Sequence, residues 1–151
     1  MITVTDSLLV DASPSRVFDL VADPQHQLAW DAGSLKHVEA LDSGPLRKGA
    51  RYRGTFDGIG EVDYEYAEYV PGERFAHHSR LPVGEVYHTF VFEPTSNGTR
   101  LVHTSRLEPV GLWKLASPLL RRMFSRRLRA MSASIGAYVN AKLGFTRYTA
   151  D

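Results

Sequence analysis

The segment GEVDYEYAEYVPGERFAHHSRLPVGEVYHTFVFEPTSNGTRLVHTSRLE, residues 60–108, decides the fold class of this chain. Apolar and polar residues alternate along four stretches of it, and the short sequences PG, LPVG and PTSNG separate these stretches. Alternation with a period of two is typical of strands that bury one face, and Gly, Pro and Asn mark the turns between them. Turns this short make neighbouring strands antiparallel. The segment therefore predicts four successive antiparallel strands.

Three more strands are predicted ahead of this segment. Residues 35–41 and 49–56 show the same alternation, and turn-forming sequences follow each of them. Residues 2–11, ITVTDSLLVD, have the β-branched content of a strand. The sequence thus predicts seven strands in all.

Two short helices are predicted between the first and second strands. Ser13 can cap the first helix, and Pro14 suits its first position because no N–H group is needed there. Asp23 and Pro24 repeat this arrangement at the start of a second short helix, which Trp30 would close. We expect Trp30 to pack in the core where the two helices meet.

The C-terminal part predicts one long helix over residues 112–143, with a bend near Pro118 and with Gly144 as its C-cap. At 100° per residue, six apolar side chains fall within one arc of this helix. They are Leu120, Phe124, Leu128, Met131, Ile135 and Tyr138. This arc is expected to face the sheet.

The order of elements predicts an α+β fold in which a curved, seven-stranded antiparallel sheet wraps around the long C-terminal helix. We expect residues 1–151 to form a single domain, since the length is ordinary for one domain and no linker is visible. One helix cannot cover the whole concave face of such a sheet. The sequence therefore predicts a cavity between the sheet and the helix.

The composition limits the chemistry that this chain can perform. It has no cysteine, which excludes disulfides, thiolate metal sites and a cysteine nucleophile. Neither a signal peptide nor an apolar run of membrane-spanning length is visible, and 43% hydrophobic with 23% charged residues is ordinary for a soluble globular protein. We expect a cytoplasmic protein.

Four segments resemble the polyketide cyclase/dehydrase and lipid-transport superfamily, also called START-like, SRPBCC or helix-grip. They are VDASPSRVFDLVADPQHQLAWD (10–31), GPLRKGARYRGTF (44–56), YVPGERFAHHSR (69–80) and GTRLVHTSRLEP (98–109). The resemblance covers the chain from Val4 to about Leu143 and consists of apolar, turn and aromatic patterns without a catalytic motif. It implies a helix-grip fold that holds a hydrophobic ligand between sheet and C-terminal helix, and it leaves the identity of that ligand open.

The strand alternation and the helical arc together predict which side chains line the cavity. We expect the ligand to contact residues from the strands and from the C-terminal helix, namely Tyr52, Phe56, Tyr64, Tyr66, His77, His88, Phe90, His103, Ser105, Phe124, Arg127, Met131 and Ile135. A small hydrophobic or amphipathic molecule, such as a lipid, an isoprenoid or a polyketide, would suit a largely apolar pocket with a few polar groups.

Three histidines share the inward phase of neighbouring strands. If LPVG makes a tight hairpin, His77 lies directly opposite His88, and His103 follows one strand further on. Zinc binding is disfavoured because no nearby carboxylate shares their phase, so we predict neither a metal nor a cofactor. The alternatives that stay open are core histidines bonded to neighbouring hydroxyl groups and histidines at the polar end of a ligand cavity.

An enzymatic reading uses the same residues. His77, His88 or His103 could act as a general base, with Tyr64 polarising a carbonyl, in a cyclase or dehydratase acting on a polyketide-like substrate. No nucleophile elbow, phosphate loop or metal-ligand motif supports turnover. We therefore assign no catalytic residue and favour binding, while a cyclase or dehydratase stays the alternative.

The charge of the chain is unevenly distributed. Residues 1–108 hold 10 Lys and Arg against 16 Asp and Glu, whereas residues 109–151 hold 8 against the single Asp151. Five arginines lie in LLRRMFSRRLRAM, 119–131, and Arg127 among them could reach the cavity mouth or meet an acidic loop residue. A solvated face, a membrane- or protein-docking module, and specifically an anionic membrane surface bound through Arg121, Arg122, Arg126 and Arg129 are the open readings. No nucleic-acid partner is expected, since no reading motif accompanies the arginines.

Overall fold

The computed structural model describes residues 1–143 of the chain. In chain order the elements are β1 (Ile2–Val10), α1 (Pro14–Val21), α2 (Pro24–Trp30), β2 (Leu35–Ala40), β3 (Arg51–Phe56), β4 (Gly60–Val70), β5 (Arg74–Leu81), β6 (Gly84–Thr95), β7 (Gly98–Pro109), the 3₁₀ helix η1 (Gly111–Ala116) and α3 (Ser117–Leu143). This order confirms the predicted fold class. The C-cap predicted at Gly144 lies outside the described residues.

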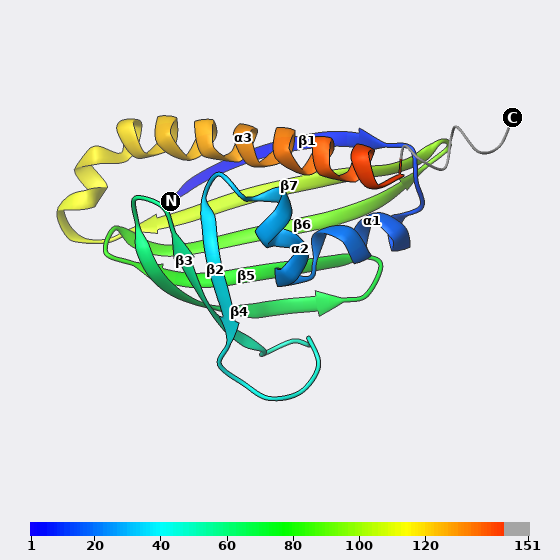
Figure 1. The fold of residues 1–151 in the computed structure, drawn as a ribbon. Helices are drawn as coiled ribbons and strands as arrows, with labels where there is room; N and C mark the ends of the chain where they lie inside the picture. The colour runs from blue at the N-terminus through cyan, green and yellow to red at the C-terminus, as the bar shows by residue number, and fades with distance from the viewer. Residues whose placement is uncertain (144–151) are drawn as a thin grey trace, which may run out of the picture.

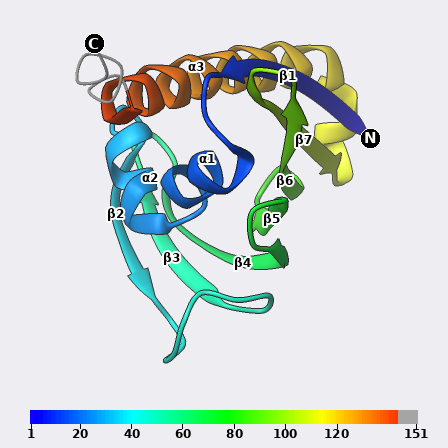
Figure 2. The same cartoon turned by 90° about the vertical axis from the view of Figure 1, so that its right-hand side faces the viewer.

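The seven strands form one antiparallel sheet in the spatial order β1-β7-β6-β5-β4-β3-β2. The first strand returns to pair with the last, from Ile2 opposite Leu107 to Val10 opposite Thr99. Register shifts between Leu35 and His37 and between Tyr66 and Glu68 bend the sheet, as bulges do. Figure 2 shows the result, a sheet that curls from β1 beside α3 round to β2, with α1 and α2 inside the curve.

Both short helices begin as their capping residues predict. The Ser13 hydroxyl accepts a hydrogen bond from the Arg16 N–H at 3.4 Å, and the Asp23 carboxylate accepts one from the Gln25 N–H at 2.8 Å. Trp30 is buried, and its indole N–H donates to the Val21 carbonyl at 3.3 Å. The two helices are therefore fixed to each other and to the inside of the sheet.

The C-terminal helix differs from the prediction in its first part. Residues 111–116 form the separate 3₁₀ helix η1, and α3 begins at Ser117. A proline ring clashes with the carbonyl four residues earlier in an α-helix, so Pro118 prevents a continuous helix through Lys114. The Lys114 carbonyl instead accepts a hydrogen bond from the Ser117 hydroxyl at 2.7 Å. In Figure 1 the chain bends at this point before α3 runs along the sheet.

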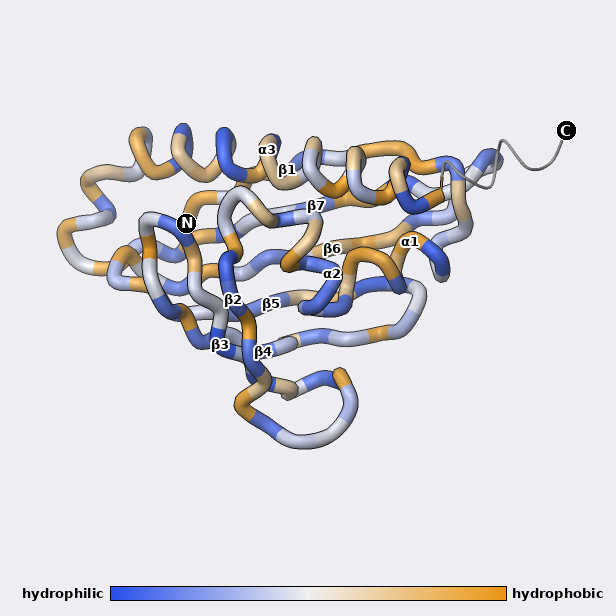
Figure 3. Tube along the Cα trace, in the orientation of Figure 1, coloured by the Kyte–Doolittle hydropathy of each residue, from blue (hydrophilic) through white to orange (hydrophobic). Residues whose placement is uncertain are grey.

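The buried apolar residues form two clusters of unequal size. The larger one joins α1, α2 and the second half of α3 to the sheet, and the smaller one surrounds Ile2, Val86, Leu107 and Leu120. Figure 3 shows that hydrophobic and hydrophilic residues alternate along the strands and helices. Among the described residues, no helix combines the length and the hydrophobicity needed to span a membrane.

Candidate functional site

A cavity of about 800 Å³ lies between the first half of α3 and the concave side of the sheet. Its walls come from β4, β5 and β6 on one side and from α3 on the other, and they include Val62, Ser79, Val86, Leu120 and Phe124. The turns between β3 and β4 and between β5 and β6 border it at the end of the sheet where α3 begins. This space lies where the element order predicts a cavity.

Eight of the thirteen side chains predicted to contact a ligand line this cavity. They are Phe56, Tyr64, His77, His88, Phe90, Phe124, Arg127 and Met131. The structure brings residues from β3, β4, β5, β6 and α3 together around one space. Contact between these residues and a ligand stays a prediction.

The other five predicted residues do not border the cavity. Tyr66 and Ile135 are fully buried in the larger core, where the Tyr66 hydroxyl donates to the Ala22 carbonyl at 2.7 Å. The ring of Tyr52 stacks on the ring of Tyr64 at 5.9 Å, and His103 and Ser105 are buried on β7. Residues of α1 and α2 share the larger core with Tyr66 and Ile135 and so occupy part of the concave face, while the cavity lies at the other end of it.

The predicted pairing of His77 opposite His88 is confirmed by the register of β5 and β6. Their rings have different neighbours. The His77 ring packs against Tyr64 and Tyr66, with centroids 4.9 and 4.5 Å apart, whereas His88 Nδ1 lies 3.2 Å from His103 Nε2. The His103 ring in turn stacks on Phe90 at 4.1 Å. His77 and His88 therefore border the cavity, whereas His103 contacts His88 and does not border it.

Burial keeps these imidazoles neutral. It lowers the pKa of His77 to about 3, with a smaller contribution from His88. It lowers the pKa of His88 to about 4, assisted by the positive charge of Arg127, and holds the pKa of His103 well below its ordinary value. A neutral imidazole has one N–H donor and one bare nitrogen, so each ring offers one of each.

The contact between His88 and His103 selects a tautomer. His103 Nδ1 is buried and has no hydrogen-bond partner among the described residues. An orphaned buried N–H is rarer than an orphaned acceptor, so the proton of His103 belongs on Nε2, which donates to His88 Nδ1. The remaining nitrogen of His88 then carries a proton. We infer that His88 offers the cavity a hydrogen-bond donor.

Within residues 1–143, no group of three or more His, Cys, Asp or Glu side chains is placed to hold a metal ion. His77, His88 and His103 lie on three adjacent strands, but the hydrogen bond between two of them occupies nitrogens that a metal would need.

Arg127 is one of two arginines that line the cavity, and the more buried of the two. Its Nη2 atom donates to the Ser34 hydroxyl at 2.6 Å, and its guanidinium carbon lies 5.8 Å from the centre of the Phe56 ring. These contacts hold the side chain beside the cavity, which is one of the two positions left open by the sequence. Four of its five N–H donors have no bond to the described residues, so they can meet an acceptor of a ligand.

Sequence reasoning missed Asp31, a buried carboxyl group on the same wall. It follows the last residue of α2, and Gln27 Nε2 donates to its Oδ2 atom at 3.4 Å. Burial raises the pKa of Asp31, against the effects of Gln27 and Arg127. A carboxylate at a helix C-terminus meets the negative end of the helix dipole, and this unfavourable position was the signal available in the sequence.

Two further polar atoms of the wall lack a partner. The Tyr64 hydroxyl oxygen and His77 Nε2 are buried and make no hydrogen bond with any described residue. Burial raises the pKa of Tyr64, so the hydroxyl group stays protonated and can donate. Both atoms belong to residues that line the cavity, but the atoms themselves have almost no accessible surface, so a ligand would reach them only if the wall shifted.

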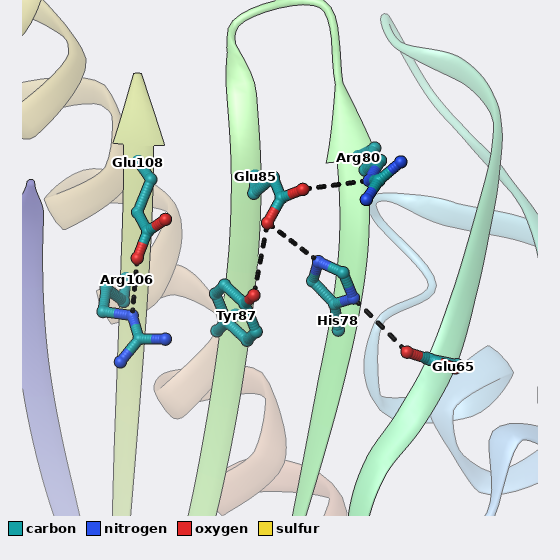
Figure 4. A network of polar contacts seen from close by, with 7 residues as sticks. All are labelled: Glu65, His78, Arg80, Glu85, Tyr87, Arg106 and Glu108. Carbon is teal, nitrogen blue, oxygen red and sulfur yellow. Dashed lines mark hydrogen bonds and ion pairs between the residues drawn. The ribbon is translucent and has the colours of Figure 1, made fainter. Parts of the chain in front are cut away.

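A polar network on the outer face of the sheet braces the hairpin that borders the cavity (Figure 4). His78 lies 3.4 Å from carboxylate oxygens of both Glu65 and Glu85. Glu85 also accepts hydrogen bonds from Arg80 at 2.9 Å and from the Tyr87 hydroxyl at 3.2 Å. These contacts tie β4, β5 and β6 together behind the cavity wall.

A family model described as polyketide cyclase/dehydrase and lipid transport matches residues 1–139. The chain belongs to this family. The match spans all seven strands and most of α3, which agrees with the resemblance seen in the four sequence segments. A search of curated protein sequences gave no match.

Solved structures with the same fold include members of known and unknown function. The Zhui aromatase/cyclase from Streptomyces sp. R1128 superposes with a TM-score of 0.75 at 17% identity, over 93% of this chain and 94% of that one. One part of the di-domain ARO/CYC BexL from the BE-7585A biosynthetic pathway gives 0.77 at 21% identity, over 93% of this chain and 47% of BexL. A protein of unknown function, SA2116 from Staphylococcus aureus, gives 0.76 at 15% identity, over 95% and 96%. At these identities the similarity establishes the helix-grip fold of the family.

Proposed function

We propose that this member of the family binds an amphipathic small molecule in the cavity between the sheet and α3. The observation that carries the proposal is the contrast within one wall, where mostly apolar side chains surround a few polar ones. A cavity of about 800 Å³ is within the usual range for small-molecule sites. A cytoplasmic location and the absence of a cofactor stay predictions.

The polar groups specify one end of the ligand. Arg127 offers free N–H donors, and neutral His88 offers one more from the facing wall. Donors that converge from two elements suit a carbonyl, carboxylate or other oxygen acceptor. The apolar body of the ligand would lie along Val86, Leu120 and Phe124.

An enzymatic function of the cyclase type has one observation in its favour, the unpaired Tyr64 hydroxyl and His77 Nε2 on the wall. A general base works best with a pKa near the operating pH, and the pKa values of about 3 for His77 and about 4 for His88 are far below it. The histidines are therefore better suited to donate or accept a hydrogen bond than to remove a proton. Ligand binding accounts for the arrangement of these side chains and does not require a histidine to act as a general base.

Two fluorescent probes with the same ring system test the proposal. Both 8-anilinonaphthalene-1-sulfonate and N-phenyl-1-naphthylamine carry the apolar body, and only the first carries an anionic group. Arg127→Met should weaken the sulfonate probe about tenfold or more, the effect of losing a charged hydrogen bond, and should leave the uncharged probe unchanged. Arg129→Met is the matched control, because Arg129 is exposed on the same helix.

A second variant tests whether the probes occupy the cavity. Ser79 is partly exposed and lines the cavity, so Ser79→Trp should fill the space and abolish binding of both probes. Circular dichroism melting checks that each variant is folded. If Ser79→Trp binds both probes as the wild type does, or if Arg127→Met and Arg129→Met act alike, the proposal is wrong. Native mass spectrometry with organic extraction then identifies any natural ligand that wild type retains and Ser79→Trp loses.

A further inference from the structure

The segment from Val110 to Met123 exposes an unusual number of large apolar side chains. Nine such residues are exposed in the described chain, and six of them lie in this one segment. They are Val110, Leu112, Trp113, Leu115, Leu119 and Met123. We propose that this segment, called here the apolar tip, docks on the surface of an anionic lipid bilayer.

The local geometry aligns these side chains. Leu112 and Leu115 are each 83% exposed, and in a 3₁₀ helix residues three apart are eclipsed, so both project from the same side of η1. Leu119 and Met123 are one turn apart on α3 and share its exposed side. In Figure 3 the bend between β7 and α3 is marked by hydrophobic residues at one end of the molecule. The tip therefore presents apolar groups that the fold itself does not bury.

Basic residues flank the apolar tip. Residues 109–143 contain seven Lys and Arg and no Asp or Glu. Lys114, Arg122 and Arg126 are exposed, and at 100° per residue Arg122 and Arg126 lie within about 60° of Leu119 around the helix axis. Within residues 1–143 neither arginine makes an ion pair at the usual distance. Arg121 is less free to contact a partner, because its Nη1 atom donates a hydrogen bond to the Thr3 carbonyl at 3.5 Å.

The charge favours a bilayer over a second copy of the chain. A two-fold contact between two tips would place one basic set against the other, and like charges in an interface are unfavourable. Glu108 lies two residues before the tip and Glu85 pairs with it across β6 and β7; both belong to the outer face of the sheet and are engaged by Arg106 and Arg80. An anionic bilayer matches both features, because apolar side chains enter the interface while arginines meet the headgroups.

The apolar tip is continuous with the border of the cavity. Met123 belongs to both, and Arg126, which flanks the tip, also lines the cavity. Pro82 and Val83 border the cavity close by, where the Val83 carbonyl accepts a hydrogen bond from the Val110 N–H at 3.0 Å. Docking through the tip would thus bring this end of the cavity to the membrane surface. The inference stands on exposed residues and holds whether or not the cavity takes a ligand.

Cosedimentation with sucrose-loaded vesicles tests the inference. The full-length protein should bind phosphatidylcholine vesicles that contain about 30% phosphatidylglycerol, bind pure phosphatidylcholine more weakly, and release at high salt. The double variant Leu112→Asp/Leu115→Asp should lower the fraction of protein bound to vesicles at least tenfold. The control Leu9→Asp should not, because Leu9 is exposed near the C-terminal end of β1 and outside the tip. Arg122→Gln should lower the bound fraction about fivefold, whereas the exposed control Arg100→Gln should not.

Three results would overturn the inference: no binding to anionic vesicles, equal losses for the tip variants and their controls, or a concentration-dependent dimer that Leu112→Asp dissociates. Sedimentation equilibrium tests the last of these. Because all substituted residues are exposed, melting curves should match the wild type. Ser79→Trp should still bind vesicles, so failure of the ligand proposal and failure of membrane docking give different results.

Discussion

The Nδ1 atom of His88 on β6 lies 3.2 Å from the Nε2 atom of His103 on β7, and one proton serves both nitrogens. We expect this proton on His103, which leaves His88 protonated at Nε2. Long-range ¹H–¹⁵N NMR correlations distinguish the two tautomers directly. A bare Nε2 on His88 would contradict the donor role proposed for it in the cavity.

Acid should destabilise the protein before most carboxylates titrate. The histidines of the wall ionise at about 6.5 when unfolded, but the folded pKa values are about 3 for His77 and about 4 for His88. The unfolded state therefore binds more protons between these values, so stability is complete above pH 6.5 and falls as the pH decreases below it. Each histidine contributes a slope of at most about 1.4 kcal/mol per pH unit. Urea unfolding between pH 7.5 and 5 measures how the free energy of unfolding changes with pH. His77→Phe should reduce this slope. His37→Gln is the control for loss of a histidine, because His37 is exposed.

Two buried tyrosines should respond differently to loss of their hydroxyl groups. Tyr66 donates to the buried carbonyl of Ala22 at 2.7 Å, so Tyr66→Phe leaves that carbonyl unpaired and should cost about 1–3 kcal/mol. The Tyr64 hydroxyl has no partner among the described residues, so Tyr64→Phe should be neutral or stabilising. Urea denaturation at neutral pH compares them. Equal losses in the two variants would show that the Tyr64 hydroxyl is satisfied in solution.

The hairpin between β5 and β6 should require glycine at position 84. Gly84 has a φ of 146°, and an added Cβ atom would lie 2.0 Å from the Glu108 carbonyl oxygen. Gly84→Ala should therefore destabilise the protein by about 3 kcal/mol or more. Gly33→Ala is the control, since no atom lies within 4 Å of its added Cβ, and it should be neutral or stabilise by about 0.4–1 kcal/mol. Thermal melts decide this, and similar melting temperatures for the two variants would disprove the steric argument.

Replacement of the buried carboxyl group of Asp31 should stabilise the protein near neutral pH. Burial raises the pKa of Asp31, so the folded state loses stability as the pH rises through the range between the unfolded and folded pKa values. Asp31→Asn removes the charge and keeps the shape. Its unfolding free energy should exceed that of the wild type at pH 7.5, and the gain should shrink in acid. The exposed Asp19→Asn should show no such gain.

Much of the candidate site could be predicted from the strand pattern. The period of two placed Tyr64, His77, His88 and Phe90 on the inner face, and the sequence LPVG fixed His77 opposite His88. The period of a strand predicts which face of the sheet a side chain lies on, but not whether other elements cover it at that point of the strand. For this reason Tyr66 was expected in the cavity, although it is covered by the segment after α1 and bonds to Ala22.

Residues between helices and strands have no periodic pattern, so their place in the candidate site could not be predicted. Asp31 follows α2, and Ser34 precedes β2, yet both lie around Arg127 on α3. Their proximity depends on how α2 packs against α3, a contact between segments about a hundred residues apart. Leu112 and Leu115 were expected within the first turns of one long helix, and their exposure on the separate 3₁₀ helix η1 was not predicted.

The sequence by itself determined the order of the elements, the antiparallel sheet and the face on which each strand residue lies, because periodicity, caps and turns are local properties of the chain. Only the tertiary structure decided which half of the concave face stays open, which polar atoms remain unpaired there and which apolar side chains stay exposed beside it. These properties depend on the volume that α1 and α2 occupy and on contacts between residues far apart in sequence, which no local pattern encodes.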